Sequence, residues 1–237
     1  YDPSRSGAVP ERLLADYKGF LQTDGYDGYL AVCSTPEIVH VGCWAHARRK
    51  FDETVKALGK GAKGKAGKAG YALSMIRKLY RIEKELREVK ASPQIRYEVR
   101  QARASPILDA LKEWLGDVLP TAPPKSALGK ALGYLSDQWS RLICYLDDGR
   151  LEMDNNMVEN AIRPFVVGRK GWLFFASVRG VKSSANLYSV IETAKANDLE
   201  PFAYLKHLFA KLPTAQTLGD YESLLPWNVS RAELSTA

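Results

Sequence analysis

A long helical pattern from Tyr71 to about Leu146 constrains the fold of this chain more than any other feature of its sequence. Apolar side chains recur there at the i, i+3 and i+4 spacing of one helix face. The first such face is formed by Leu73, Ile76, Leu79, Tyr80, Ile82 and Leu86. A second helix is expected to start near Pro106, and a third to run from Ser126, a suitable N-cap, to about Tyr145. The sequence therefore predicts a mostly helical protein.

Two short strands are expected before this helical stretch. Residues 20–23 and 37–43 are rich in β-branched or apolar side chains, and the first run stops at Asp24-Gly25, a turn pair. Helix-forming residues from Trp44 to Phe51 follow the second run directly. A strand, a turn with an acid, a strand and a helix together indicate part of an α/β sheet domain.

Residues 56–70 interrupt both patterns with five lysines and five glycines. This composition predicts a flexible, positively charged loop, because the segment lacks a periodic apolar face. The loop is either a solvated linker or a contact to a polyanion, and the two roles are compatible because lysines beside DNA release counterions.

The C-terminal third begins with an acidic segment. Asp154 is expected to cap a short helix over residues 155–162, which ends before Pro164. The further expected elements are a basic turn at 168–171, a strand-like run at 172–175, and amphipathic helices near 183–196 and 200–211.

The composition fits a chain that binds an acidic partner. Lys and Arg exceed Asp and Glu by 34 to 27, a formal net charge of +7, and nucleic acid is the commonest polyanion. No apolar run reaches the roughly 20 residues of a membrane-spanning helix. The three cysteines have no paired spacing, which favours a reducing cytoplasm.

Two acids have positions suited to metal binding. Asp24 ends a strand at a glycine turn, and Glu159 lies on a short helix among Asn155, Asn156 and Arg163. Mg²⁺ prefers carboxylate oxygens and water, and paired ions activate an attacking hydroxyl in phosphodiester chemistry. From spacing alone, ordinary turn and surface roles are favoured over metal binding for both acids.

Five sequence strings, in order, resemble the transposases of the insertion sequence 66 family. They are LQTDGYDGY at 21–29, GCWAHARRKFDE at 42–53, DGRLEMDNNMVENAIRP at 148–164, GRKGWLFFAS at 168–177 and LYSVIETAKAND at 187–198. The resemblance extends to the LLPW near the end. It implies a bacterial DDE transposase, a metal-dependent enzyme that cuts and rejoins DNA.

The resemblance implies a mostly helical α/β protein that contains part of a ribonuclease-H-like fold, namely strands 4–5 and the following helices. Its catalytic acids in this chain are then Asp24 and Glu159, which bind Mg²⁺ or Mn²⁺. The expected domain division is catalytic domain at 1–55, helical insertion at 56–146, catalytic domain again at 147–212, and C-terminal tail at 213–237.

A third acid of the triad has no match in residues 1–237. Neither Asp2 nor Asp16 stands in the sequence setting that the first family aspartate requires, and Asp154 is assigned to capping. The first three strands and this aspartate are therefore expected upstream. We accordingly expect the chain alone to be inactive.

Cys43 and His46 form a C-x-x-H pair after the second acid. A structural zinc site needs two further ligands at a paired spacing, which the other cysteines and histidines do not supply. A positioning role beside the active site, shared with Asn155 and Asn156, is the favoured interpretation, and simple packing is the alternative.

Several basic residues lie close in sequence to the two acids and are candidates for holding DNA phosphates. They are Arg48, Arg49, Lys50, Arg163, Arg169 and Lys170. A solvated basic surface is the alternative. Trp172 either stacks on a flipped base or packs in the core.

The predicted function is cleavage of transposon-end DNA and its transfer to target DNA, with a homo-oligomer as the active assembly. A truncated, non-catalytic remnant that at most binds DNA or a protein partner is the alternative, and the unmatched first acid favours it. The cytoplasm is the expected location, without membrane association.

Overall fold

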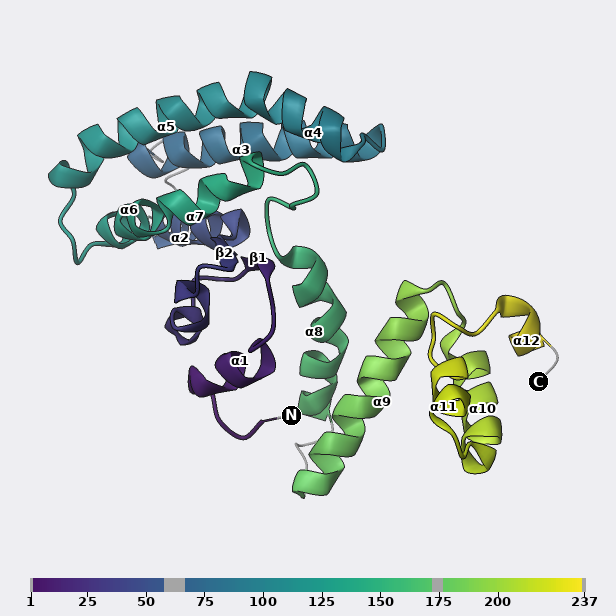
Figure 1. Ribbon diagram of the computed structural model, residues 1–237. Helices are drawn as coiled ribbons and strands as arrows, with labels where there is room; N and C mark the ends of the chain where they lie inside the picture. The colour runs from purple at the N-terminus through teal and green to yellow at the C-terminus, as the bar shows by residue number, and fades with distance from the viewer. Residues whose placement is uncertain (1, 58–66, 172–176, 236–237) are drawn as a thin grey trace. The chain divides into compact units, whose positions relative to one another are not determined.

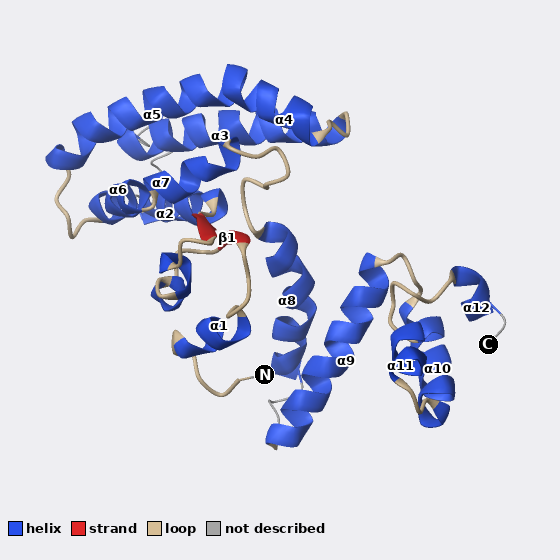
Figure 2. Cartoon of the chain, in the orientation of Figure 1, coloured by secondary structure: helices blue, strands red, loops and turns tan. Residues whose placement is uncertain are grey.

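The computed structural model describes residues 2–57, 67–171 and 177–235 of the chain. These residues form two compact units, which lie within Asp2–Met157 and Val158–Ala237. The described part is mostly helical, as the sequence predicts, and Figure 2 shows how little of it is strand. None of the described helices is both long and apolar enough to cross a membrane.

The larger unit begins with α1 (Ala8–Leu13) and a sheet of two parallel strands, β1 (Gly19–Gln22) and β2 (Ile38–Val41). Residues 23–37 make the crossover that a parallel pair requires, and they include short 3₁₀ turns at Asp27–Tyr29 and Val32–Ser34. β2 lies within its expected range, whereas β1 begins at Gly19, one residue before its expected range. Phe20 pairs with Val39, which places the end of β1 beside the end of β2.

Helices complete this unit, and in Figure 1 α3 and α5 lie side by side. Their bounds are α2 (Trp44–Ala57), α3 (Gly67–Glu88), α4 (Pro93–Val99), α5 (Ser105–Val118), α6 (Ala127–Asp137) and α7 (Trp139–Ile143). A π-helical segment, Arg100–Ala104, joins α4 to α5, and short 3₁₀ turns lie at Leu119–Thr121 and Cys144–Leu146. The expected helical stretch is thus confirmed.

The core of the larger unit lies among α2, α3, α5 and α6. Its largest fully buried apolar side chains include Trp44, Phe51, Leu79 and Leu132. Trp44 also donates from its indole nitrogen to the backbone oxygen of Leu142 at 2.9 Å. Burying a side chain of this size contributes roughly 1.5–3 kcal/mol to folding, so α2 is firmly attached to the helices around it.

Capping and proline explain most of the observed helix starts. Ser126 accepts a hydrogen bond from the amide of Gly129 and caps α6 as predicted, and Pro106 lies in the first turn of α5. The expected helix from Ser126 to Tyr145 is wrong as one element. It divides into α6, α7 and a 3₁₀ turn. The break lies at Gln138, whose backbone angles, φ −93° and ψ −1°, depart from those of an α-helix.

The charged loop expected at 56–70 is partly wrong. Lys56 and Ala57 continue α2, and residues 67–70 already belong to α3, where Lys68 donates to the hydroxyl of Thr121 at 2.7 Å. Tertiary packing outweighs the weak helix propensity of the glycines there, because Ala69 is buried in the core. The remaining loop residues, 58–66, lie outside the described part.

The smaller unit contains most of α8 (Asn156–Gly171), then α9 (Val178–Ala196), α10 (Pro201–Lys211), α11 (Leu218–Ser223) and α12 (Arg231–Ser235), with a 3₁₀ turn at Leu212–Thr214. A second, small core joins Ala194, Leu199, Tyr204 and Val229. The two expected amphipathic helices are confirmed as α9 and α10.

The end of the acidic helix was predicted wrongly. α8 does not stop before Pro164 but continues through it to Gly171, so the basic turn expected at 168–171 is helical. A proline within a helix removes one backbone donor, and here that loss does not end the helix. The strand-like run at 172–175 lies outside the described residues.

Candidate active site

Asp24 lies two residues after the end of β1 and is half-buried. Its Oδ1 accepts a hydrogen bond from the amide of Tyr26 at 3.0 Å, and its backbone oxygen accepts one from the hydroxyl of Tyr134 at 3.0 Å. Gly25 makes the turn at φ 82°, a conformation that favours glycine. Among the described residues no hydrogen bond or ion pair to the second carboxylate oxygen, Oδ2, is found.

A cavity of about 280 Å³ opens beside Asp24. Its other lining residues are Ser4, Arg5, Ser6, Val9, Pro10, Tyr26 and Tyr29. The guanidinium of Arg5 lies 5.4 Å from the centre of the Tyr26 ring, and the Tyr26 hydroxyl donates to the Arg5 backbone oxygen at 2.7 Å. The carboxylate therefore borders an open space whose lining includes a cation, Arg5.

Side chains at the strand ends attach this turn to the segment before α8. Gln22 donates from Nε2 to the backbone oxygens of Gly42 at 3.1 Å and Glu152 at 2.9 Å. Thr23 and His40 face each other across the strand pair, with 2.7 Å between Oγ1 and Nε2. Burial, with a smaller contribution from Arg141, lowers the pKa of His40. Sequence reasoning missed these residues, although each stands at a strand end.

Cys43 and His46, the C-x-x-H pair, are brought together at the start of α2. The Nδ1 atom of His46 lies 3.2 Å from the Cys43 sulfur, which in turn donates to Oδ1 of Asn155 at 3.0 Å. Burial raises the pKa of the Cys43 thiol, so the neutral thiol is favoured as a donor. Three of the four residues expected to share a positioning role thus make one cluster, while Asn156 is exposed at the first position of α8.

Asp154 lies next to this cluster. Its Oδ2 accepts a hydrogen bond from the hydroxyl of Tyr80 in α3 at 2.7 Å, and its Oδ1 accepts one from the amide of Asn156 at 3.0 Å. The helix begins at Asn156, one residue later than expected, so Asp154 satisfies its first amide from just outside the cap position. The contact with Tyr80 was not foreseen, since the two residues are far apart in sequence.

Glu159 lies in the first turn of α8, half-buried, as the sequence predicts. It belongs to the smaller unit, whereas Asp24 belongs to the larger one. The two proposed ligands thus belong to different units.

The predicted DNA-binding residues fall into two groups. Arg48, Arg49 and Lys50 are exposed on consecutive positions of α2, and Arg163 is exposed on α8. Arg48 lies over the ring of Tyr80 at 5.9 Å, and Lys50 lies over that of Tyr134 at 5.7 Å. The side chains of Arg169 and Lys170, and the whole of Trp172, lie outside the described residues.

The donor chemistry at Asp24 suits a hard divalent cation, because one carboxylate oxygen is unspent beside an open cavity. Within residues 2–57, 67–171 and 177–235, however, no three His, Cys, Asp or Glu side chains gather closely enough to hold a metal ion. Metal binding by Asp24 therefore stays a prediction.

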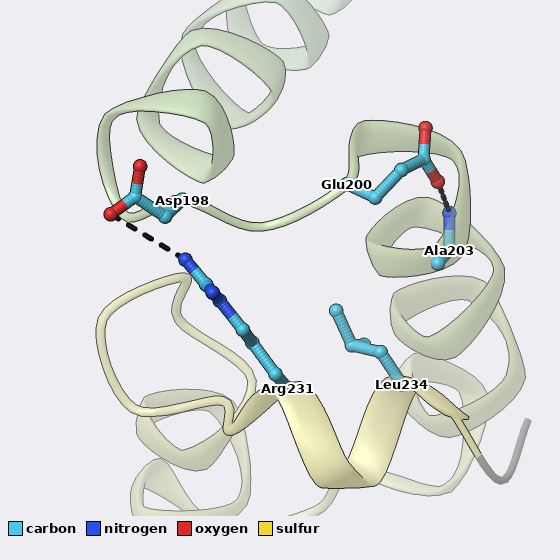
Figure 3. Close-up of a pocket in the computed structure, with 5 residues that line it drawn as sticks. All are labelled: Asp198, Glu200, Ala203, Arg231 and Leu234. Atoms are coloured by element: carbon cyan, nitrogen blue, oxygen red, sulfur yellow. Dashed lines mark hydrogen bonds and ion pairs between the residues drawn. The ribbon is translucent and has the colours of Figure 1, made fainter.

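A second cavity, of about 400 Å³, lies in the smaller unit at α10 and α12 (Figure 3). Arg231 pairs there with Asp198 at 3.5 Å, and Glu200 accepts from the amide of Ala203 at 2.6 Å. Among its described lining residues there is no member of the predicted site. Glu200 caps α10, which accounts for its position.

Comparison with known proteins identifies the family of this chain. The family described as Transposase IS66 family matches residues 1–183, and the IS66 C-terminal element matches residues 189–227. The chain therefore belongs to the IS66 family of transposases, and the resemblance read from its motifs is confirmed.

Similar curated proteins come from Sinorhizobium fredii (strain NBRC 101917 / NGR234). The uncharacterized protein y4jD is 34% identical over 235 residues, which cover 96% of this chain and 44% of that protein. The uncharacterized protein y4hP is 34% identical over 98% of this chain and 43% of its own length. The chain thus spans less than half the length of these relatives. No solved structure matches it.

Proposed function

We propose that this chain is part of the catalytic region of a DDE transposase, which cleaves DNA at the ends of an insertion sequence and joins the strands to target DNA. The position of Asp24 carries the proposal. This acid lies two residues after the end of the first strand of a parallel pair, borders an open cavity, and keeps one oxygen without a hydrogen bond among the described residues. Membership of the IS66 transposase family supports the same reading.

Asp24 and Glu159 are proposed to hold Mg²⁺ or Mn²⁺ together with an acid outside residues 1–237. When bound, the metal neutralises charge on the phosphodiester and favours the attacking hydroxyl. The protein contributes mainly orientation, since this chemistry needs no covalent protein intermediate. Because two carboxylates alone bind a divalent cation weakly, we expect the chain by itself to be inactive.

The contacts around the acids fit this assignment of roles. Cys43, His46 and Asn155 form one hydrogen-bonded cluster that is proposed to fix the start of α8 against α2. Asn156, exposed beside it, is proposed to assist. The neutral thiol donates to the Asn155 amide oxygen, which leaves the amide nitrogen available to a further acceptor.

The basic residues are proposed to bind the DNA backbone. Arg48, Arg49 and Lys50 present exposed cations on one short stretch of α2, close in sequence to the Cys43 cluster. Arg163, Arg169 and Lys170 on α8 are proposed to act in the same way. The active assembly is proposed to be a homo-oligomer on transposon-end and target DNA in the cytoplasm.

The parallel strand pair is proposed to be strands 4 and 5 of a ribonuclease-H-like fold, with residues 56–146 as the helical insertion. The domain division given above, with catalytic parts at 1–55 and 147–212 and a tail at 213–237, is part of this proposal.

Strand transfer by the full-length transposase tests the proposal. Glu159→Gln and Asp24→Asn should abolish joining of transposon-end DNA while DNA binding persists, because each removes a metal ligand without altering the basic surface. Asp16→Asn, at an exposed residue of the same unit, should act as wild type. Wild-type joining by Glu159→Gln contradicts the proposal, and a full-length protein that never joins DNA favours the remnant alternative.

A further inference from the structure

Two tyrosines of the insertion contact the segments that carry the proposed metal ligands. Tyr134, on α6, donates its hydroxyl to the backbone oxygen of Asp24 at 3.0 Å. The space between them is tight, because a Cβ atom on Gly25 would lie 3.1 Å from the same hydroxyl. The tyrosine therefore fixes the backbone of the acid itself.

Tyr80, on α3, makes the matching contact at the acidic helix. Its hydroxyl donates to Oδ2 of Asp154 at 2.7 Å, and Oδ1 of the same carboxylate accepts from the amide of Asn156 at 3.0 Å. Asn156 is the first residue of α8, and Glu159 lies in the first turn of that helix. The carboxylate thus connects the insertion to the point where the acid-bearing helix begins.

Each tyrosine ring also lies beneath a cation of α2. Arg48 is 5.9 Å from the centre of the Tyr80 ring, and Lys50 is 5.7 Å from that of Tyr134. Both cations are exposed, and α2 packs against the helices of both tyrosines. A cation at such a distance is attracted by the ring quadrupole, so these rings restrict where the two charges can go.

Both hydroxyls remain donors at neutral pH. Burial, followed by the hydrogen bond to Asp154, raises the pKa of Tyr80 well above its usual value. A tyrosine hydroxyl in water, with a pKa of about 10, is already protonated at pH 7. A protonated hydroxyl is required for each of the two hydrogen bonds.

We propose that Tyr80 and Tyr134 are positioning residues, each of which holds an acid-bearing segment with its hydroxyl and a phosphate-binding cation with its ring. This proposal rests on the proposed function. It gives the helical insertion a role in that function, because the two tyrosines hold both the acid-bearing segments and the DNA-binding cations of α2. Outer contacts of this kind typically change metal affinity or activity by about 10–100-fold when removed.

The test separates the hydroxyl from the ring in the full-length transposase. Tyr80→Phe and Tyr134→Phe keep the ring and remove the donor. Each should raise the Mn²⁺ concentration for half-maximal strand transfer by about tenfold, with the rate recovering at saturating Mn²⁺ and DNA affinity unchanged. Arg48→Gln should have the opposite pattern: DNA affinity falls, and the Mn²⁺ concentration for half-maximal strand transfer stays that of wild type.

Tyr145→Phe is the matched control. Its hydroxyl is buried and has no hydrogen-bond partner among the described residues, so its removal should leave the Mn²⁺ dependence unchanged. Asp154→Asn has one oxygen for two donors, the Tyr80 hydroxyl and the Asn156 amide, so it should raise the Mn²⁺ midpoint less than Asp154→Ala but not restore wild-type behaviour. If Tyr80→Phe does not fold, Asp154→Ala removes the same bond from the other side and is judged by the same measurement.

Wild-type Mn²⁺ dependence in folded Tyr80→Phe and Tyr134→Phe proteins overturns the positioning role. The positioning role is also overturned if the variants yield less folded protein but the same Mn²⁺ concentration for half-maximal strand transfer. That result would show that the tyrosines contribute to stability only. Glu159→Gln separates this failure from that of the proposed function: if it is inactive while both tyrosine variants act as wild type, only the positioning role is wrong.

Discussion

Arg100 and Glu83 form a doubly hydrogen-bonded ion pair in which both side chains are almost fully buried. The two N–O distances are both 2.8 Å, and the exposed side-chain fractions are 0% and 1%. The guanidinium also donates to the backbone oxygens of Tyr145, Asp148 and Leu151 at 2.8–3.1 Å. One side chain thus fastens the π-helical segment and α3 to the chain that leads towards α8.

Glu83→Gln is expected to destabilise the larger unit strongly. The change leaves the charge of Arg100 buried without its counterion, which costs about 3–5 kcal/mol in comparable cases. Glu85→Gln on the same helix is the matched control, because its partner Arg103 is half-exposed and such pairs contribute about 0–1 kcal/mol. Denaturant unfolding measures both, and equal losses would contradict the importance of the buried pair.

Gly25→Ala should lower stability by about 1–2 kcal/mol, since the residue has φ 82° and a new Cβ would approach the Tyr134 hydroxyl. Gly116→Ala, inside α5 with open space around its Cβ, should raise stability by about 0.5–1 kcal/mol. Thermal unfolding of the two variants checks the opposite signs. A neutral Gly25→Ala would show that the turn tolerates a side chain.

His40 should make stability dependent on pH. Its pKa is lowered in the folded protein by burial, then by Arg141, so the unfolded chain takes up a proton first as the pH falls. Its contribution is present above the unfolded pKa of about 6.5 and is lost as the pH falls through the lower folded value. Denaturant unfolding near pH 7.5 and 5.5 should show a smaller loss for His40→Gln than for wild type. Identical losses in the two proteins would exclude this role.

Binding of the chain to duplex DNA should be salt-dependent and should involve α2. Arg49→Gln, at an exposed residue of this helix, is expected to reduce the slope of log K against log salt by about 0.9, as the loss of one phosphate contact does. Lys84→Gln, on an exposed residue that pairs with Glu88, is the control and should leave the slope unchanged. Fluorescence anisotropy over a salt series measures both, and equal slopes would remove Arg49 from the interface.

Local signals predicted much of this fold. Three kinds of feature depend on residues close in sequence, and the structure contains them. They are the end of the first strand near Asp24, the cap at Ser126, and the helices near 183–196 and 200–211. The helix end predicted before Pro164 was wrong because a proline disfavours a helix without always ending it. α8 loses one amide donor at Pro164 and continues.

The contacts around the site were beyond such reasoning. Tyr80 was assigned to an apolar helix face by its spacing, yet its hydroxyl reaches Asp154, 74 positions away. Arg100 stood in a charged stretch that gave no sign of burial, because its partners come from two distant segments, α3 and residues 145–151. Motif resemblance identified Asp24, Cys43 and Asn155 as candidates, and only the folded chain shows which of them touch.

Calorimetric titration of Mn²⁺ into the full-length transposase tests the central claim, that Asp24 and Glu159 are metal ligands completed by an acid outside residues 1–237. The account predicts that the full-length protein binds Mn²⁺, that Asp24→Ala and Glu159→Ala each abolish binding, that Asp16→Ala does not, and that the 237-residue chain alone binds far more weakly. Wild-type Mn²⁺ affinity in either Asp24→Ala or Glu159→Ala, or in the 237-residue chain, would contradict it.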